Sequence, residues 1–231
     1  VFDNNPSQAG NDYTWTIDYA AVGGGSVTSG DIIQYYVAAQ DVNGVAGTNP
    51  SGGSGSNPPG TVDPGVPNTY NIVNSLTGTF TVGTTTGTYT TLQAAFDFVN
   101  ANAVASDIIL QIQPEGTVET GTAQLNAVSY TGAAHWNITI KPAAGSTPTI
   151  ASSSATPVLL NGADYVIIDG SNNGSTTRDL TISTTSVSTA SALVWMQTTA
   201  GNDASTNNTL KNCNLTGNTN LTTLFGAGSG G

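Results

Sequence analysis

The sequence predicts an all-β protein whose larger, C-terminal part winds into stacked coils with three walls of parallel strands. One observation is a strand-like tetrapeptide that returns along the chain and ends each time in a turn-forming residue. Another is the composition, because 28 of the 231 residues are glycine and only 7% are charged. Strong helix formers are scarce, and only one short segment has a helical period.

The repeated tetrapeptide sets the length of a coil. Its second residue, which we expect to face inward, is Ile112, Ile140, Ile168 and Leu210, at intervals of 28, 28 and 42 residues. A coil of this length holds three short strands, which pair in parallel with those of the next coil about 4.8 Å away. The longer last interval predicts a loop over the polar residues 198–208. The other predicted strands are 149–150 and 180–182 in a second wall, and 158–160 and 192–196 in a third.

Just before the coils, residues 89–103 change to a helical period. Thr90 or Thr91 can serve as the N-cap of this helix. A stack of coils has an open apolar end, and a helix laid across it would cover that end and its strand edges. We therefore expect an N-terminal capping helix. Its apolar face consists of Leu92, Ala95, Phe96 and Val99.

The N-terminal part of the chain has a different pattern. Residues 13–19 and 33–39 alternate apolar and polar side chains, which is typical of strands with one buried face. Two strands do not close a core, so residues 1–49 are predicted to be the C-terminal part of an immunoglobulin-like β-sandwich. Residues 50–69 are rich in Gly, Ser and Pro and are predicted to be a linker. Residues 70–231 are then the cap and first coils of a truncated stack, and the chain is a fragment.

The charge excludes several classes of partner. The formal net charge is −11, and Lys141, Arg178 and Lys211 are the only fixed cations, so we expect no nucleic acid and no anionic membrane as partner. No apolar run approaches the roughly 18 residues that a membrane crossing needs.

The single cysteine, Cys213, is expected to pack inside a coil, and the single histidine, His135, to have a turn or packing role.

The third residues of the tetrapeptides are predicted to point outward from one wall. They are Gln113, Lys141, Asp169 and Lys211. Opposite charges on successive exposed strands attract by about 0.3 kcal/mol. A calcium-dependent lyase needs several clustered carboxylates, and a hydrolase needs two that face each other. We therefore interpret Asp169 and its two lysines as a structural charge stack, although they are the one group that approaches a catalytic arrangement.

Two further positions are candidates for binding. If Val194 and Met196 face inward, Leu193 and Trp195 face outward, and an exposed Trp195 can stack against a sugar ring. The alternatives are that the 198–208 loop covers Trp195, or that the opposite alternation places it in the core. The sequence from Asp41 to Gly44 has oxygen ligands for calcium, but an Asn-Gly turn needs no metal. No cofactor is expected, and calcium is the one candidate.

Three stretches of this sequence resemble a known group of proteins. They are residues 30–41 at the end of the immunoglobulin-like part, 89–96 before the coils and 160–170 within them. These stretches resemble large secreted cell-surface proteins of gliding and polymer-degrading Bacteroidota, which are exported by type 9 secretion. The coils resemble the right-handed parallel β-helix of the pectate-lyase-like superfamily. The resemblance implies an extracellular or cell-surface location, associated with the outer membrane.

That fold serves lyases, hydrolases, adhesins and stalks, so it does not by itself select a function. We expect a non-enzymatic structural or adhesion module without catalytic residues. Its predicted ligand-binding residues are Trp195, Asp169, Lys141 and Lys211. The expected partners are carbohydrate or another cell-surface polymer, neighbouring chains, or further coils of the parent protein. The alternative is a polysaccharide lyase or hydrolase, which three or more convergent carboxylates near Asp169 would favour.

Overall fold

The computed structural model describes residues 7–10, 12–189, 191–199, 201, 203–218 and 223–229. It divides into two compact units, Val1–Asn74 and Ser75–Gly231. The boundary falls a few residues beyond the predicted start of the coil region at residue 70.

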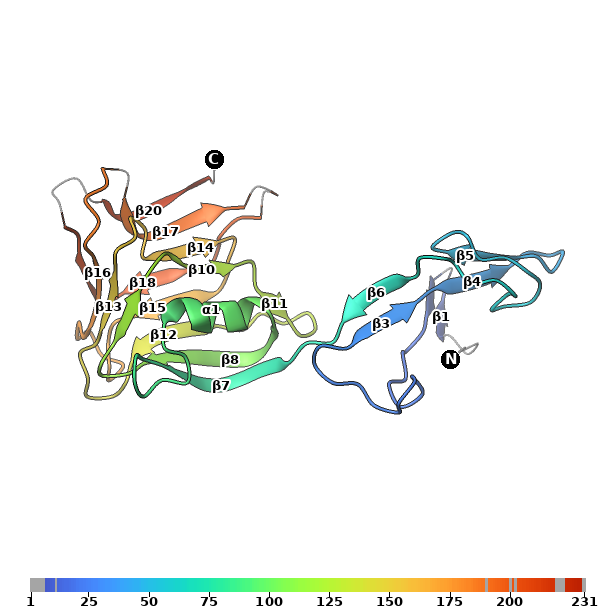
Figure 1. The fold of residues 1–231 in the computed structure, drawn as a ribbon, viewed down its shortest axis with the longest axis horizontal. Helices are drawn as coiled ribbons and strands as arrows, with labels where there is room; N and C mark the ends of the chain where they lie inside the picture. Colours follow the sequence, from blue (N-terminus) through green and yellow to red (C-terminus); the bar gives the residue numbers. More distant parts are fainter. Residues whose placement is uncertain are drawn as a thin grey trace. The chain divides into compact units, whose positions relative to one another are not determined.

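The second unit is a β-solenoid of about four turns with three parallel sheets, here called the first, second and third walls (Figure 1). The first wall contains β7 (Ser75–Val82), β8 (Ala103–Ile112), β11 (Ser129–Tyr130), β12 (Ile138–Pro142), β15 (Val166–Asp169) and β18 (Thr209–Lys211). The second contains β9 (Thr117–Glu119), β13 (Thr149–Ser152), β16 (Leu180–Thr184) and β19 (Cys213–Thr216). The third contains β10 (Ala123–Asn126), β14 (Val158–Asn161), β17 (Ala192–Thr198) and β20 (Thr223–Ser229).

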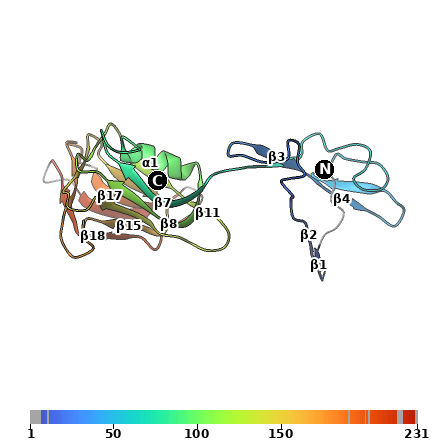
Figure 2. The same ribbon diagram turned by 90° about the horizontal axis from the view of Figure 1, so that it is seen from below.

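The predicted stacking of coils is confirmed, since every strand pair within the walls is parallel. Strands of the first wall run side by side in Figure 2. The predicted partners in the other two walls are also confirmed. Ile150 lies opposite Ile182 in the second wall, and Val158 lies opposite Val194 in the third.

The register of the first coil differs from the prediction by two residues. Ile140 lies opposite Ile168, and Ile168 opposite Leu210, as predicted. The partner of Ile140 in the preceding strand, however, is Leu110, and Ile112 pairs with Pro142. A shift of two residues keeps the same side chains facing inward, so alternation in the sequence cannot distinguish the two registers. The outward neighbour of Lys141 is consequently Gln111 and not Gln113.

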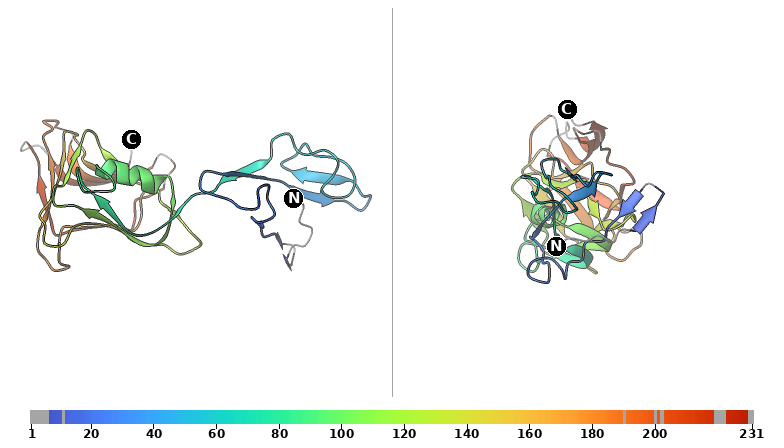
Figure 3. Two further views of the ribbon diagram at one scale, coloured as in Figure 1. Left: turned by 60° about the horizontal axis from the view of Figure 1, so that its bottom comes forward. Right: turned by 90° about the vertical axis from the view of Figure 1, so that its right-hand side faces the viewer.

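Figure 3 shows the strands of the second unit from two further directions. The walls enclose one continuous apolar core. Along β12 the side chains of Ile138, Ile140 and Pro142 are buried, and the two residues between them are half-buried. Ile140 and Ile150 are fully closed to solvent. Burying one such side chain contributes about 2 kcal/mol, so the repeated inward positions stabilise the stack together.

Glycine is required where two coils approach closely. Gly170 follows β15, and its N–H donates to the Lys211 carbonyl of the next coil, 3.0 Å away. A Cβ atom at Gly170 would collide with the Asn212 backbone. This explains why one of the four turn positions holds the smallest residue.

The single helix among the described residues, α1 (Leu92–Asn100), confirms the predicted helical segment. Thr91 is its N-cap, and the Thr91 hydroxyl accepts a hydrogen bond from the Ala94 N–H at 3.1 Å. The four apolar residues predicted to form its inner face are buried. The helix contacts β10 most extensively and also touches β7, β8 and β9. α1 has nine residues, and no helix in the described part of the chain has the length and apolarity of a membrane-spanning segment.

The first unit consists of three small antiparallel sheets, with strand orders β1-β2, β3-β6 and β4-β5. Its strands are β1 (Ser7–Ala9), β2 (Asp12–Thr14), β3 (Ile32–Tyr35), β4 (Val37–Gln40), β5 (Ala46–Asn49) and β6 (Asn68–Asn71).

The strands of the first unit are shorter than predicted. Of the predicted strand 13–19, only its beginning belongs to a strand, β2, and the predicted strand 33–39 is divided between β3 and β4. The segment predicted as a linker, 50–69, folds back within the unit. The Ala46 N–H donates to the Gly55 carbonyl at 2.9 Å, and β6 pairs with β3. Among the described residues of this unit, the buried ones are Ile33, Ala46 and Pro64.

Candidate functional site

The first candidate site is centred on Asp169, at the end of β15 in the first wall. Asp169 Oδ2 lies 3.2 Å from Lys211 Nζ on the neighbouring strand. Asp169 Oδ1 accepts hydrogen bonds from Asn212 Nδ2 at 2.9 Å and from the Ser171 N–H at 3.1 Å. Both carboxylate oxygens are therefore used in contacts between or within coils.

These contacts determine the protonation of Asp169. Burial raises its pKa, but hydrogen bonds from Asn212 and Ser171 and the charge of Lys211 lower it more, so the net shift is downward. A carboxyl group with a lowered pKa remains ionised at neutral pH and is a poor proton donor. The contacts of Asp169 therefore stabilise its negative charge and connect its coil to the next one.

The predicted charge stack is present only in part. Lys141 follows Ile140, which lies opposite Ile168, so the register places Lys141 on the strand beside Asp169. The ion pair recorded among the described residues is Asp169 with Lys211. The four predicted ligand-binding residues do not converge, because Trp195 belongs to the third wall.

The loop after Asp169 is rich in side-chain oxygen atoms, which form hydrogen bonds with one another within the loop. Ser171 Oγ lies 3.0 Å from Asn173 Oδ1 and 3.0 Å from Thr177 Oγ1. Thr177 Oγ1 in turn lies 2.6 Å from Asp179 Oδ2. Hydrogen bonds within the loop occupy these oxygens, and the described residues contain no group of three or more His, Cys, Asp or Glu able to hold a metal. The loop therefore closes as a polar turn.

The turn at Asp41, in which the sequence offers oxygen ligands for calcium, joins β4 to β5. Asp41 Oδ1 accepts hydrogen bonds from the Asn43 N–H and the Val45 N–H, both at 2.9 Å. The hydrogen bond from Val45 is the main cause of a lowered Asp41 pKa. The geometry is that of a hairpin turn closed by its own aspartate.

Trp195 lies on the outer side of the third wall. Val194 before it is fully buried, whereas Trp195 is half-buried. Trp195 pairs with Leu159 on β14 and with Gly226 on β20, and a Cβ atom at Gly226 would collide with the Trp195 ring. The ring thus covers the glycine of the next strand. Leu193, which alternation places on the outside with Trp195, is instead buried in the core, because all of Ala192, Leu193 and Val194 are buried where β17 begins.

A ladder of side-chain amides runs beside Trp195 on the same wall. Gln197 Nε2 donates to Asn161 Oδ1 at 3.0 Å, and Asn161 Nδ2 donates to Asn126 Oδ1 at 3.0 Å. Gln124 Nε2 donates to the same Asn126 oxygen at 2.7 Å. Strand β10 thus contributes two amides, and β14 and β17 contribute one each. This ladder was not predicted, because its members lie 35 and 36 residues apart in the sequence.

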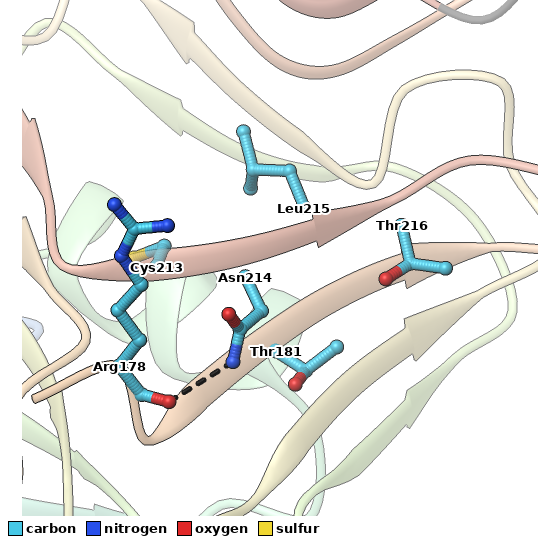
Figure 4. A pocket seen from close by; sticks show the side chains of 6 residues that line it. All are labelled: Arg178, Thr181, Cys213, Asn214, Leu215 and Thr216. Carbon is cyan, nitrogen blue, oxygen red and sulfur yellow. Dashed lines mark hydrogen bonds between the residues drawn. The ribbon is translucent and has the colours of Figure 1, made fainter.

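A pocket of about 690 Å³ lies on the second wall, between β16 and β19 (Figure 4). Asn214 Nδ2 donates to the Arg178 carbonyl at 2.9 Å across one side of it. Burial raises the pKa of the Cys213 thiol to about 11, which favours the unreactive thiol form. Its lining contains no carboxylate or imidazole that would activate the thiol: Arg178, Thr181, Cys213, Asn214, Leu215 and Thr216.

His135 belongs to an aromatic cluster on the first wall. Its ring stacks on Tyr165 with centroids 4.9 Å apart, and Tyr130 meets it edge-on at 5.2 Å. The Tyr130 hydroxyl donates to the Asp164 carbonyl at 3.0 Å. His135 therefore packs against rings, and the described structure brings no catalytic partner to it.

Comparison with known proteins assigns no family. No protein-family model matches this chain, and searches of curated proteins and of solved structures return no match. The geometry of the site is accordingly the basis for a functional assignment.

Proposed function

We propose that this chain is a non-enzymatic structural and adhesion module of a larger secreted protein that is displayed at a cell surface. The solenoid serves as a stiff spacer in this proposal, and its walls present surfaces to carbohydrate, to neighbouring chains or to further coils. Its winding is right-handed, and the first unit is part of an immunoglobulin-like domain. The resemblance to type 9-secreted Bacteroidota proteins supports the location.

The observation that carries this proposal is the use of Asp169 within the coil stack. This residue is the one that comes closest to a catalytic carboxylate, yet both of its oxygens are bonded to neighbouring structure. Its lowered pKa opposes a role as general acid. The polar groups of this site form an ion pair and hydrogen bonds that join neighbouring coils, which is the role expected in a scaffold.

The contacts of α1 support a capping role for this helix. β10 is the edge strand of the third wall, so its outer backbone groups lack a strand partner. Gln93 Oε1 accepts from the Gln124 N–H at 2.9 Å, and Asn100 Oδ1 accepts from the Asn126 N–H at 2.9 Å. Asn100 Nδ2 donates to the Gln124 carbonyl at 3.1 Å. Two amide side chains of the helix thus take the place of a further strand and block pairing with other chains.

Incubation of the purified chain with acidic and neutral polysaccharides tests the absence of catalysis. Ultraviolet absorption detects the unsaturated products of a lyase, and a reducing-end assay detects hydrolysis. We expect neither signal above that of buffer with polygalacturonate, alginate, xylan or cellulose.

The variant Asp169→Asn is the matched control for this assay. If the chain releases products and Asp169→Asn abolishes them, the module is a polysaccharide-active enzyme and the proposal is wrong. A signal that persists in Asp169→Asn at the same level would indicate a contaminating activity, which repeated purification removes.

A further inference from the structure

The outer side of the third wall carries an aromatic residue beside a row of side-chain amides. Burial alternates along β10 and β14, so the side chains between the buried residues point outward. Together with the corresponding residues of β17 they form two parallel rows across three coils. We call this surface the Trp195 face, and it consists of Gln124, Leu159 and Trp195 in one row and Asn126, Asn161 and Gln197 in the other.

Two residues of the first row, Leu159 and Trp195, provide an apolar platform. Trp195 and Leu159 lie opposite each other on neighbouring strands, and both are half-buried. Gly226 on β20 leaves room for the Trp195 ring, which therefore lies over the next strand. An indole held against a wall in this way can cover the apolar side of a sugar ring with its exposed part.

The second row provides hydrogen-bonding groups beside that platform. The hydrogen bonds of the amide ladder hold the Asn126, Asn161 and Gln197 side chains in one orientation. In the described part of the chain, no bond is recorded for Gln197 Oε1 or for Asn126 Nδ2. A pre-oriented acceptor and donor next to an aromatic ring suit the hydroxyl groups of a sugar.

The charge of the face selects among polysaccharides. None of its six residues is ionisable, and the whole chain carries a net charge of −11. A uronic-acid polymer would find no cation on the face and would be repelled by the chain as a whole. A neutral polysaccharide carries no charge and is therefore not repelled by the negatively charged chain.

We propose that the Trp195 face binds a neutral polysaccharide, with the sugar ring stacked on Trp195 and its hydroxyl groups bonded to the amide ladder. This inference rests on the proposed adhesive function and names its ligand class and its residues. Lys141, Asp169 and Lys211 lie on the first wall and take no part in it.

Pull-down of the purified chain on microcrystalline cellulose and on chitin, with alginate beads as the acidic comparison, provides the test. Titration with soluble cellohexaose and chitohexaose then gives Kd. We expect binding to at least one neutral polymer and none to alginate. Trp195→Ala should raise Kd roughly ten-fold, which corresponds to about 1.4 kcal/mol, because the stacking contact with the sugar ring is lost.

Two variants keep the test informative if Trp195→Ala alters the fold. Gln197→Ala removes one end of the ladder and should raise Kd about three-fold while leaving Trp195 in place. Val118→Ala changes an exposed residue of the second wall, and its Kd should equal that of the unaltered chain. Thermal unfolding by circular dichroism verifies that each variant is folded.

The inference is overturned if the chain binds no neutral polymer, binds alginate equally well, or binds with unchanged Kd in folded Trp195→Ala and Gln197→Ala. This failure is distinct from failure of the proposed function. A chain that bound cellulose through Trp195 and also cleaved it would retain the binding face and lose the assignment as a non-enzymatic module.

Discussion

In the second unit the inward residues Ile112, Ile140 and Ile168 are closed to solvent, whereas the alternating residues within 13–19 of the first unit remain accessible. Trp15, Ile17 and Tyr19 are 38%, 40% and 40% exposed, and Ile140 is 0% exposed. Both segments alternate apolar and polar side chains in the sequence. The difference shows that alternation creates an apolar face, and that only a second layer of strands converts this face into a core.

The largest expected effect compares one isoleucine from each unit. Ile140→Ala removes a fully buried side chain between Leu110 and Ile168 and should lower the free energy of unfolding of the solenoid by about 4 kcal/mol. Ile17→Ala removes an exposed side chain and should cost less than about 1 kcal/mol. Urea unfolding followed by circular dichroism measures both. Equal losses for the two variants would contradict the contrast between the units.

A pair of glycines tests the close approach of coils. Gly170→Ala places a Cβ against the Asn212 backbone, and the cost should be about 3 kcal/mol because a backbone yields poorly. Gly23→Ala in the first unit meets nothing within 4 Å and should be neutral or slightly stabilising. Thermal unfolding of the two variants gives the comparison. A harmless Gly170→Ala would mean that the coils can separate at this turn.

Two carboxylates that each accept two backbone hydrogen bonds differ strongly in burial. Glu119 is 2% exposed and accepts from the Leu92 N–H at 2.7 Å and the Gln93 N–H at 3.1 Å. Glu119→Ala leaves these groups at the start of α1 without a partner and should cost about 2 kcal/mol. Asp41→Ala at the exposed hairpin turn should cost clearly less, since water can replace the carboxylate. The urea midpoints of unfolding of the two variants measure this difference. A larger loss of stability in Asp41→Ala than in Glu119→Ala would contradict the prediction.

The smallest expected effect is a pH dependence at Asp169. Because its pKa is lower in the folded protein than its ordinary value of 3.8, its ionised form stabilises the fold above that pH. This contribution disappears as the pH falls below 3.8 through the lower pKa of the folded state. Asp169→Asn should therefore lower Tm at pH 7, and the difference from the unaltered chain should shrink towards pH 2. A constant difference across this range would show that Asp169 does not contribute through its charge.

Much of the solenoid could be predicted from local patterns. The strands around Ile140, Ile150 and Val158 and the helix from Leu92 follow from side-chain periodicity, which neighbouring residues specify by themselves. The first coil was predicted two residues out of register, because period-2 alternation is unchanged by such a shift. The Gly, Ser and Pro content of residues 50–69 predicts a linker, although backbone groups of this segment bond within the first unit.

The candidate sites were less predictable than the strands. Trp195 was identified from the sequence, but its position over Gly226 depends on β20, which lies in the next coil. The amide ladder and the contact of His135 with Tyr165 join residues separated by about one coil. No short stretch of sequence predicts such pairs, because the two residues meet only after the loops between them, which differ in length, have brought the coils together.

The sequence by itself determined most of the inward side chains, although not Leu193, as well as where the helix begins and which residues turn the chain. These properties arise within a few neighbouring residues. Only the tertiary structure decided which strands pair, how the first coil aligns, and which polar groups remain available on the Trp195 face. Those properties depend on strand pairing and side-chain hydrogen bonds between residues 28 to 43 positions apart. Examples are the pairing of Ile140 with Ile168 and the hydrogen bond from Asn212 Nδ2 to Asp169 Oδ1, whose geometry no short segment encodes.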